Sequence, residues 1–436
     1  MKEGGKGAEA PRGRFIKRAE TVAPALLLYA AIKIIGIAVL AVWSTANGKD
    51  FHELLSGRWD SLWYARIAEY GYGFTLDAPD GRSLSSMAFF PLLPWLEELG
   101  GLVGLAPGDA GLLVSAVSSI VAAAGLFHLG GLAHSPRAGT LLVCLWAALP
   151  VAIVQSMAYS ESLFVALASW SLYALLKDRW TVAGILSCLA GLTRPVGMAV
   201  AAAILVAALP VLLTAWRERR QRGPRRATGP RQKAGLRQEA GPRQEGRLRR
   251  TAGPRREYGP GGAPGPWAGG ARLADVLTGT LLAPLGATAY ILWVGSRQGE
   301  FLGYLDVQKE WGNGFDGGKA FAEFITAPVG APVVLTALVV LGLLALSLWT
   351  NWISWRQNRL LPLAVYSLIV TLLAVGASGY FGSKPRLLLP AFPLLIPLAV
   401  ALATRAGRTT RYLTVSALVV ISAVYGAFWL NGSGPP

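Results

Sequence analysis

The residues best suited to chemistry in this chain lie in one aromatic-rich stretch, Gly57 to Tyr72. The apolar residues there follow the i, i+4, i+8, i+11 spacing of one helix face: Trp59, Trp63, Ile67 and Tyr70. Trp and Tyr concentrate where a membrane meets water, so the pattern predicts a helix lying at that interface. Asp60 stands at its start, and a carboxylate held beside a hydroxyl can act as a general base. The alternative is that Asp60 only caps the helix.

Four further ionisable residues stand beside long apolar runs: Glu161, Arg194, Lys384 and Arg386. Charged groups at membrane depth cost free energy and usually serve a function. Lys384 and Arg386 are candidates to hold a leaving phosphate, with Arg194 and Arg58 as further candidates. Each has a structural alternative. Lys384 and Arg386 can snorkel to lipid headgroups, Arg194 can pair with Glu161, and Glu161 can stabilise a helix dipole.

The composition places these residues in a membrane protein. Of the 436 residues 53% are hydrophobic and only 15% are charged, and the mean hydropathy is +0.44. This excludes a disordered chain and argues against a soluble enzyme. The net charge of +17 is concentrated in 217–272, which holds 16 Lys and Arg against four Glu, a local charge of +12. Gly and Pro recur there with a period of six, which predicts a disordered linker.

Eleven apolar runs are candidate membrane spans, most near the ~20 residues that cross the hydrocarbon core. They are 21–45, 108–133, 138–158, 160–176, 180–196, 197–216, 273–295, 331–352, 360–380, 386–404 and 411–430. The run 89–105 is excluded because Pro91 and Pro94 interrupt it and Glu97 and Glu98 sit within it. We expect it to be a re-entrant or interfacial piece on the outer face.

Basic residues in short loops predict the orientation. They predict a cytoplasmic basic tail over 1–20, an N-terminal module over 21–216 with an outer loop over 46–107, a cytoplasmic linker over 217–272 and a C-terminal module over 273–436. In this arrangement Asp60 and the four other ionisable residues all map to the outer side. One extracytoplasmic site is the simplest explanation.

Five motifs carry a family resemblance. The run Arg58–Tyr64 with Gly71-Tyr72 resembles the first-loop motif of the PIG-V type of GPI mannosyltransferase and its bacterial relatives. The other four occur in the family's order: 89–94, 158–164, 180–197 and 384–393. Together they cover residues 20–400 apart from the basic linker.

The resemblance implies an all-α GT-C glycosyltransferase fold that uses polyprenyl-phosphate-mannose outside the cytoplasm. Asp60 falls on the family's motif Asp, which implies the role of general base in an inverting transfer. It further implies a site on the same motifs, with substrate contacts from Trp59, Trp63, Tyr64, Tyr159, Ser160 and Glu161. The acceptor would be a lipid or glycan.

Several alternatives stay open. The same fold could use another lipid-linked sugar, such as arabinose or glucose, or the chain could be a transporter, a flippase or a non-catalytic membrane subunit. Asp60 has no acidic residue two positions away, so no metal site is predicted, although metal dependence is left open. Cys144 and Cys188 lie within apolar runs and predict neither zinc nor a disulfide. The Ala, Gly and Arg content suggests a bacterial plasma membrane, and nucleic acid is not an expected partner.

Overall fold

The computed structural model describes residues 11–78, 81–221, 272–320, 360–378 and 383–432, with single residues between 323 and 352. Five described helices are long and apolar enough to cross a membrane: Thr21–Ala46, Pro107–Ala133, Gly197–Gln221, Leu273–Gln298 and Arg408–Asn431. The predicted all-helical integral membrane architecture is confirmed, but the count of eleven spans is not. The predicted span 331–352 and residues 222–271 of the predicted linker lie outside the continuously described residues.

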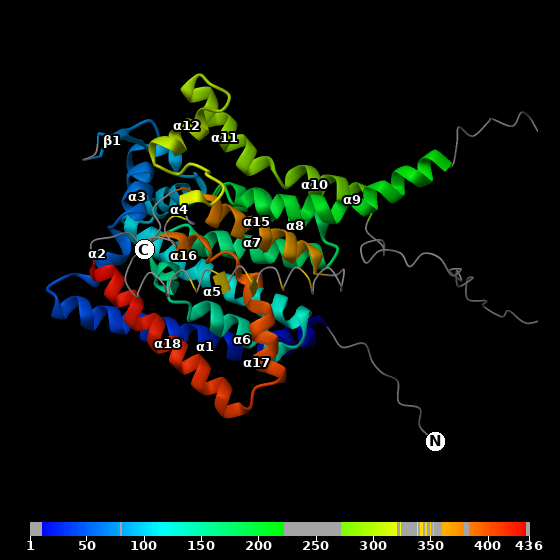
Figure 1. Ribbon diagram of the computed structural model, residues 1–436, viewed down its shortest axis with the longest axis horizontal. Coiled ribbons are helices and arrows are strands. Elements are labelled where there is room, and N and C mark those ends of the chain that lie inside the picture. The colour runs from blue at the N-terminus through cyan, green and yellow to red at the C-terminus, as the bar shows by residue number, and fades with distance from the viewer. Residues whose placement is uncertain are drawn as a thin grey trace, which may run out of the picture.

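The N-terminal part alternates long helices with short elements. The long helices are α1 (Pro11–Ala46), α5 (Pro107–Ala133), α6 (Pro136–Ala147), α7 (Glu161–Leu176), α8 (Trp180–Gly191) and α9 (Gly197–Gln221). The short elements between α1 and α5 are α2 (Phe51–Ser56), α3 (Asp60–Tyr70), β1 (Thr75–Asp77), β2 (Ser83–Ser85), η1 (Ser86–Ala88) and α4 (Leu92–Gly101). Strands β1 and β2 form an antiparallel hairpin that periodicity did not predict. Figure 1 shows α2, α3 and β1 gathered at one end of the long helices.

The C-terminal part packs against this body. It comprises α10 (Leu273–Leu282), α11 (Leu285–Gln298), α12 (Gly303–Glu310), α15 (Leu361–Gly376), α16 (Lys384–Leu387), η4 (Phe392–Leu395), α17 (Ile396–Thr404) and α18 (Arg408–Asn431). Helix α18 runs beside α1, and α15 runs beside α9 (Figure 1). The last described residues therefore return to the end of the molecule that holds α2 and α3.

Two predicted spans are broken by proline. The predicted span 138–158 becomes α6, a turn at Pro150 and the short helix η2 (Ala152–Ser156). The predicted span 386–404 becomes α16, η4 and α17, because Pro390 and Pro393 lack the N–H that a continuous helix needs. Both breaks free backbone carbonyls inside the protein, and these must find donors.

Gln155 and Lys33 supply the donors for the first break. The Lys33 Nζ donates to the Ala152 carbonyl at 2.6 Å, and the Gln155 Nε2 donates to the Trp146 carbonyl at 2.9 Å. The Ser162 hydroxyl in turn donates to the Gln155 carbonyl at 3.0 Å. This polar network holds an irregular segment that leads directly into Tyr159, Ser160 and Glu161.

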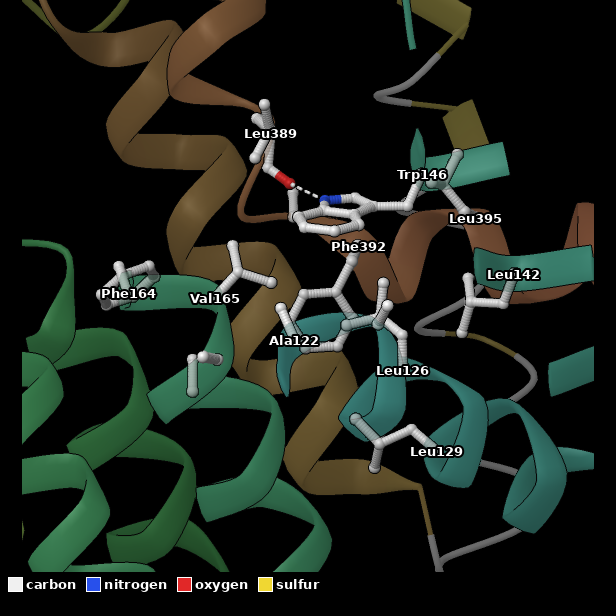
Figure 2. Packing of buried hydrophobic residues seen from close by; sticks show 14 of the residues in the cluster. Ala122, Leu126, Leu129, Leu142, Trp146, Phe164, Val165, Leu389, Phe392 and Leu395 are labelled. Atoms are coloured by element: carbon white, nitrogen blue, oxygen red, sulfur yellow. Dashed lines mark hydrogen bonds between the residues drawn. The ribbon is translucent and has the colours of Figure 1, made fainter. Parts of the chain in front are cut away.

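Aromatic side chains donate hydrogen bonds to the backbone carbonyls freed at the second break. The Trp146 indole N–H donates to the Leu389 carbonyl at 3.3 Å, and the Tyr366 hydroxyl donates to the Pro390 carbonyl at 2.9 Å. Figure 2 shows Trp146 above Phe392 in the centre of the main apolar core. The segment that follows Arg386 is thus fixed to α6 and α15 by buried side chains.

Helices α8 and α10 cross at small residues. A Cβ built on Gly184 would lie 2.7 Å from the Gly279 Cα, far inside ordinary contact distance. Two glycines at this crossing allow the backbones to touch, which is a common way for helices to associate within membranes.

Helix α4 carries an unusual buried acid. Glu97 is 1% exposed, and neither of its carboxylate oxygens has a hydrogen-bond partner among the described residues. Its carboxyl group packs against Gly111 of α5, where a Cβ would meet the Glu97 Cδ at 3.3 Å. The neighbouring Glu98 is exposed, as expected for an interfacial helix. Burial raises the pKa of Glu97 to about 9, so this side chain is neutral at pH 7.

Replacing Glu97 with Gln is expected to stabilise the protein at neutral pH. Between the ordinary pKa of 4.5 and the raised pKa of about 9, the folded state binds a proton that the unfolded state lacks. Stability therefore falls as pH rises through this window. The neutral amide of Gln removes this dependence of stability on pH. It raises the free energy of unfolding by on the order of 2 kcal/mol at pH 7. Thermal unfolding in detergent from pH 5 to 9 measures how the stability of each variant changes with pH. The exposed neighbour gives the control Glu98→Gln, and an unchanged slope in Glu97→Gln would contradict the assignment.

Candidate active site

Asp60 is the first residue of α3, and an unusual backbone places it there. The preceding Trp59 has φ 52° and ψ −118°, a left-handed conformation that costs about 1–3 kcal/mol for a non-glycine residue. The Arg58 guanidinium lies 4.1 Å from the Trp59 ring centroid. The Ser61 hydroxyl donates to the Arg58 carbonyl at 2.6 Å and accepts from the Arg58 N–H at 3.0 Å. Such strain is commonest at functional sites.

The Asp60 side chain makes an ion pair instead of capping the helix. Trp59 is the N-cap of α3, and no side-chain capping hydrogen bond forms there. The Asp60 Oδ2 instead accepts from the Arg386 Nη2. These two residues are 326 positions apart in the chain. The carboxylate is thereby held by the C-terminal part of the fold.

Arg386 joins Asp60 to a second, deeper carboxylate. Its Nε donates to the Glu161 Oε1 at 2.6 Å, and the Arg194 Nη1 pairs with the same oxygen. Two carboxylates and two guanidinium groups thus form one charge-balanced cluster drawn from α3, α7, the α8–α9 connection and α16. Buried charges are tolerated when they are paired in this way. The structural alternative for Arg194, pairing with Glu161, is the contact observed.

The cluster is open on the side of Asp60. The Asp60 side chain is 24% exposed, against 8% for Arg386 and 1% for Glu161. A ligand would therefore approach at Asp60, with Glu161 forming the floor. The Glu161 Oε2 has no hydrogen-bond partner among the described residues.

Tyrosine and serine hydroxyls surround the charges. The Tyr64 hydroxyl and the Ser160 Oγ are 2.8 Å apart, and the Arg194 Nη1 donates to the same Ser160 Oγ at 3.3 Å. The Tyr159 ring lies under the Arg386 guanidinium, 4.7 Å from ring centroid to Cζ. Burial raises the pKa of Tyr159 far above its ordinary value, so its hydroxyl remains a proton donor. That hydroxyl has no hydrogen-bond partner of normal geometry in the described part of the chain.

An aromatic wall stands beside the cluster. Trp63 is stacked between Phe74 and Phe89, with ring centroids 5.6 and 5.5 Å away. Trp311 closes its edge at 4.8 Å and donates its indole N–H to the Ser85 carbonyl at 3.0 Å. Trp63 therefore packs among three aromatic rings and is the centre of this wall. The contacts of Trp311 also tie the segment after α12 to the segment between α3 and α4.

Two of the predicted phosphate ligands lie outside the cluster. The Lys384 Nζ donates to the Ala377 and Val375 carbonyls at the end of α15. Burial lowers the pKa of Lys384, and nearby Asp316 partly opposes this. Arg58 turns away from Asp60, and its Nη1 donates to the Leu430 carbonyl at 2.8 Å. In this structure both side chains bind backbone carbonyls.

Arg58→Ala is expected to weaken the fold more than phosphate binding. Arg58 donates to the Leu430 carbonyl and, at 3.2 Å, to the Gly432 carbonyl, so its loss frees the end of α18. We expect a loss of about 1 kcal/mol in stability and an unchanged dissociation constant for a polyprenyl phosphate, the carrier of the donor that the sequence resemblance implies. Thermal unfolding and lipid binding measure the two effects. Arg66→Ala, which removes an exposed arginine of α3, is the control. A tenfold loss of affinity with unchanged stability would instead place Arg58 on the phosphate.

Sequence reasoning included the Arg194–Glu161 pair among its alternatives but missed the contacts of Arg386 that organise the site. It singled out Asp60 and Arg386 separately, as base and phosphate ligand, but nothing in the sequence indicated that they bind each other. Sequence reasoning also did not predict that Phe74 and Phe89 stack with Trp63 in the aromatic wall. Within the described residues no group of three or more His, Cys, Asp or Glu side chains is arranged to hold a metal ion.

Comparison with known proteins gives matches in structure only. A scan of family models finds no match, and neither does a sequence search of curated proteins. The chain is similar to ArnT from Cupriavidus metallidurans bound to undecaprenyl phosphate, at 12% identity and a TM-score of 0.48, over 93% of this chain and 75% of that one.

The oligosaccharyltransferase of Archaeoglobus fulgidus is also similar. Its complex with Zn and sulfate matches at 12% identity and a TM-score of 0.46 over 93% of this chain, and AglB with an inhibitory peptide and a dolichol-phosphate matches at 11% and 0.43 over 94%. This chain spans 53% and 56% of those two chains. Likeness at this level is loose, so the chemistry must be read from the chain's own residues.

Proposed function

We propose that this chain is a membrane glycosyltransferase of the GT-C type, in the PIG-V-like group. It would move mannose from polyprenyl-phosphate-mannose to a lipid or glycan acceptor on the extracytoplasmic face. The observation that carries the proposal is the meeting of Asp60 with Arg386, Glu161 and Arg194 in one partly open cluster. These residues come from the first, third, fourth and last of the five motifs that carry the family resemblance.

The cluster contains the groups that an inverting transfer needs. A carboxylate at Asp60 takes the proton of the acceptor hydroxyl as the oxygen attacks the anomeric carbon of the sugar. The new bond joins acceptor oxygen to that carbon, and the bond from the carbon to the phosphate oxygen breaks. The phosphate leaves with the electron pair, as polyprenyl phosphate. The negative charge that develops there needs fixed cations, and Arg386 and Arg194 are the nearest.

The surrounding side chains fit supporting roles. Tyr64 and Ser160 orient Arg194 through their shared hydrogen bonds, and the Tyr159 hydroxyl is available to a substrate oxygen. The wall of Trp63, Phe89 and Trp311 shields the site from water on one side. Trp59 sets the direction of the Asp60 carboxylate through its backbone.

A donor panel tests the proposal. Purified protein is incubated with labelled polyprenyl-phosphate-mannose, with the same lipid carrying glucose or arabinose, and with GDP-mannose, in the presence of native membranes as acceptor. We expect label in a membrane product only with a lipid-linked donor, and most with mannose. Transfer from GDP-mannose alone, or no transfer from any donor of the panel, would contradict the proposal. Transfer from another lipid-linked sugar would retain the chemistry and replace the sugar.

A further inference from the structure

The proposed base and the proposed phosphate ligand are bound to each other in this structure. We propose that the donor phosphate and the Asp60 carboxylate compete for the Arg386 guanidinium, so that donor binding releases Asp60 to act as the base. This inference rests on the proposed function and adds a regulatory step to that site. In the unliganded protein Asp60 is paired with Arg386. The lipid phosphate releases Asp60 by binding Arg386 in its place.

Arg386 is held in a way that permits such an exchange. Its Nε is fixed to the buried Glu161 at 2.6 Å, and its guanidinium lies over the Tyr159 ring. Only its Nη2 is committed to Asp60. Among the described residues its Nη1 has no hydrogen bond. The Nε of Arg386 thus stays bound to Glu161, while its Nη2 can exchange Asp60 for another anion without movement of the whole side chain.

Exposure indicates which partner is replaceable. Asp60 is 24% exposed, whereas Glu161 is 1% exposed and is also held by Arg194. Removing Arg386 from Glu161 would leave a deeply buried charge short of a partner, which is costly. Turning Asp60 away exposes a carboxylate that already reaches the open side. An entering anion therefore displaces Asp60 and leaves Glu161 in place.

The exchange has a chemical consequence. The Asp60 lone pair that accepts the Arg386 hydrogen bond cannot at the same time accept the proton of an acceptor hydroxyl. When a phosphate oxygen takes the guanidinium, that lone pair becomes free to accept the proton of an acceptor hydroxyl. On Arg386 itself one anion replaces another, and the displaced Asp60 carboxylate is left without its cation on the open side of the cluster. The base becomes active only when the donor is in place.

If Asp60 competes with the phosphate, removing its charge strengthens phosphate binding. If Asp60 instead helped to bind the phosphate, the same change would weaken binding. If Asp60 competes with the phosphate, Asp60→Asn removes the competitor and should bind undecaprenyl phosphate more tightly, by about fivefold or more. Arg386→Gln should bind it at least tenfold more weakly. Glu69→Gln, which removes an exposed acid from the same helix, controls for the general loss of negative charge and should leave the dissociation constant unchanged.

The measurement is titration of the full-length protein in nanodiscs with undecaprenyl phosphate. Neutral undecaprenol and inorganic phosphate are the comparison ligands, which separate the lipid from the anion. If Asp60→Asn is poorly folded by thermal unfolding, Asp60→Ser replaces it. Tighter binding in either variant, absent in Glu69→Gln, supports the competition. Equal or weaker binding overturns it, while sugar transfer by the unmodified protein would still stand. Absence of sugar transfer alongside tighter Asp60→Asn binding would overturn the proposed function alone.

Discussion

Asp60→Asn is expected to reduce sugar transfer by about 10²- to 10⁴-fold, the range that a general base contributes. The amide keeps the size of the carboxylate but cannot accept the acceptor's proton. Arg386 retains its bond to Glu161, so the variant should remain folded. Initial rates with saturating lipid-linked donor measure the loss, and it should appear in kcat because the lost interaction belongs to the transition state.

The control for this variant is Glu69→Gln in the same helix, where the side chain is exposed and faces no charge of the cluster. Its rate should match that of the unmodified protein. If Asp60→Asn transfers sugar within threefold of the unmodified rate while unfolding at the same temperature, Asp60 is not the base.

Glu161→Ala is expected to have the largest effect on stability. Glu161 is 1% exposed and binds both Arg386 and Arg194, so its removal leaves Arg194 without its carboxylate and Arg386 with Asp60 alone. Breaking a buried ion pair by removing one partner costs about 3–5 kcal/mol. We expect a loss in this range, measured by thermal or denaturant unfolding in detergent.

A double-mutant cycle with Arg194 separates pairing from packing. If the contact is an ion pair, Glu161→Leu with Arg194→Leu should be less destabilising than the sum of the two single changes. An additive result would show that the two side chains contribute independently, and would remove the pairing as the reason for their burial.

The sequence predicted the kind of fold well and its interruptions poorly. Apolar runs of 20 to 26 residues became the long helices α1, α5 and α18, because burying a continuous apolar face in lipid depends on composition. The breaks at Pro150 and after Arg386 required knowledge of which donors would satisfy the freed carbonyls. Trp146 and Gln155 supply them from other elements. The run 89–105 forms the 10-residue helix α4, shorter than the five helices long enough to cross a membrane.

The site could be predicted as a list of residues, but of its contacts only the Arg194–Glu161 pair was among the alternatives. Ionisable residues beside apolar runs are visible in sequence because they are costly there, and this singled out Asp60, Glu161, Arg194 and Arg386. Lys384 carried the same signal, yet it binds carbonyls of α15. Which cation meets which carboxylate depends on the packing of helices that lie far apart in the chain. Local spacing holds no information about that.

One measurement tests the central claim most directly. Purified protein is given polyprenyl-phosphate-mannose with one label in the sugar and another in the phosphate, and both labels are followed into product. We predict that the sugar label enters the acceptor with inverted anomeric configuration, while the phosphate label is recovered as polyprenyl phosphate in equal amount. Both labels in the acceptor, or retained configuration, would contradict direct attack by a hydroxyl activated at Asp60.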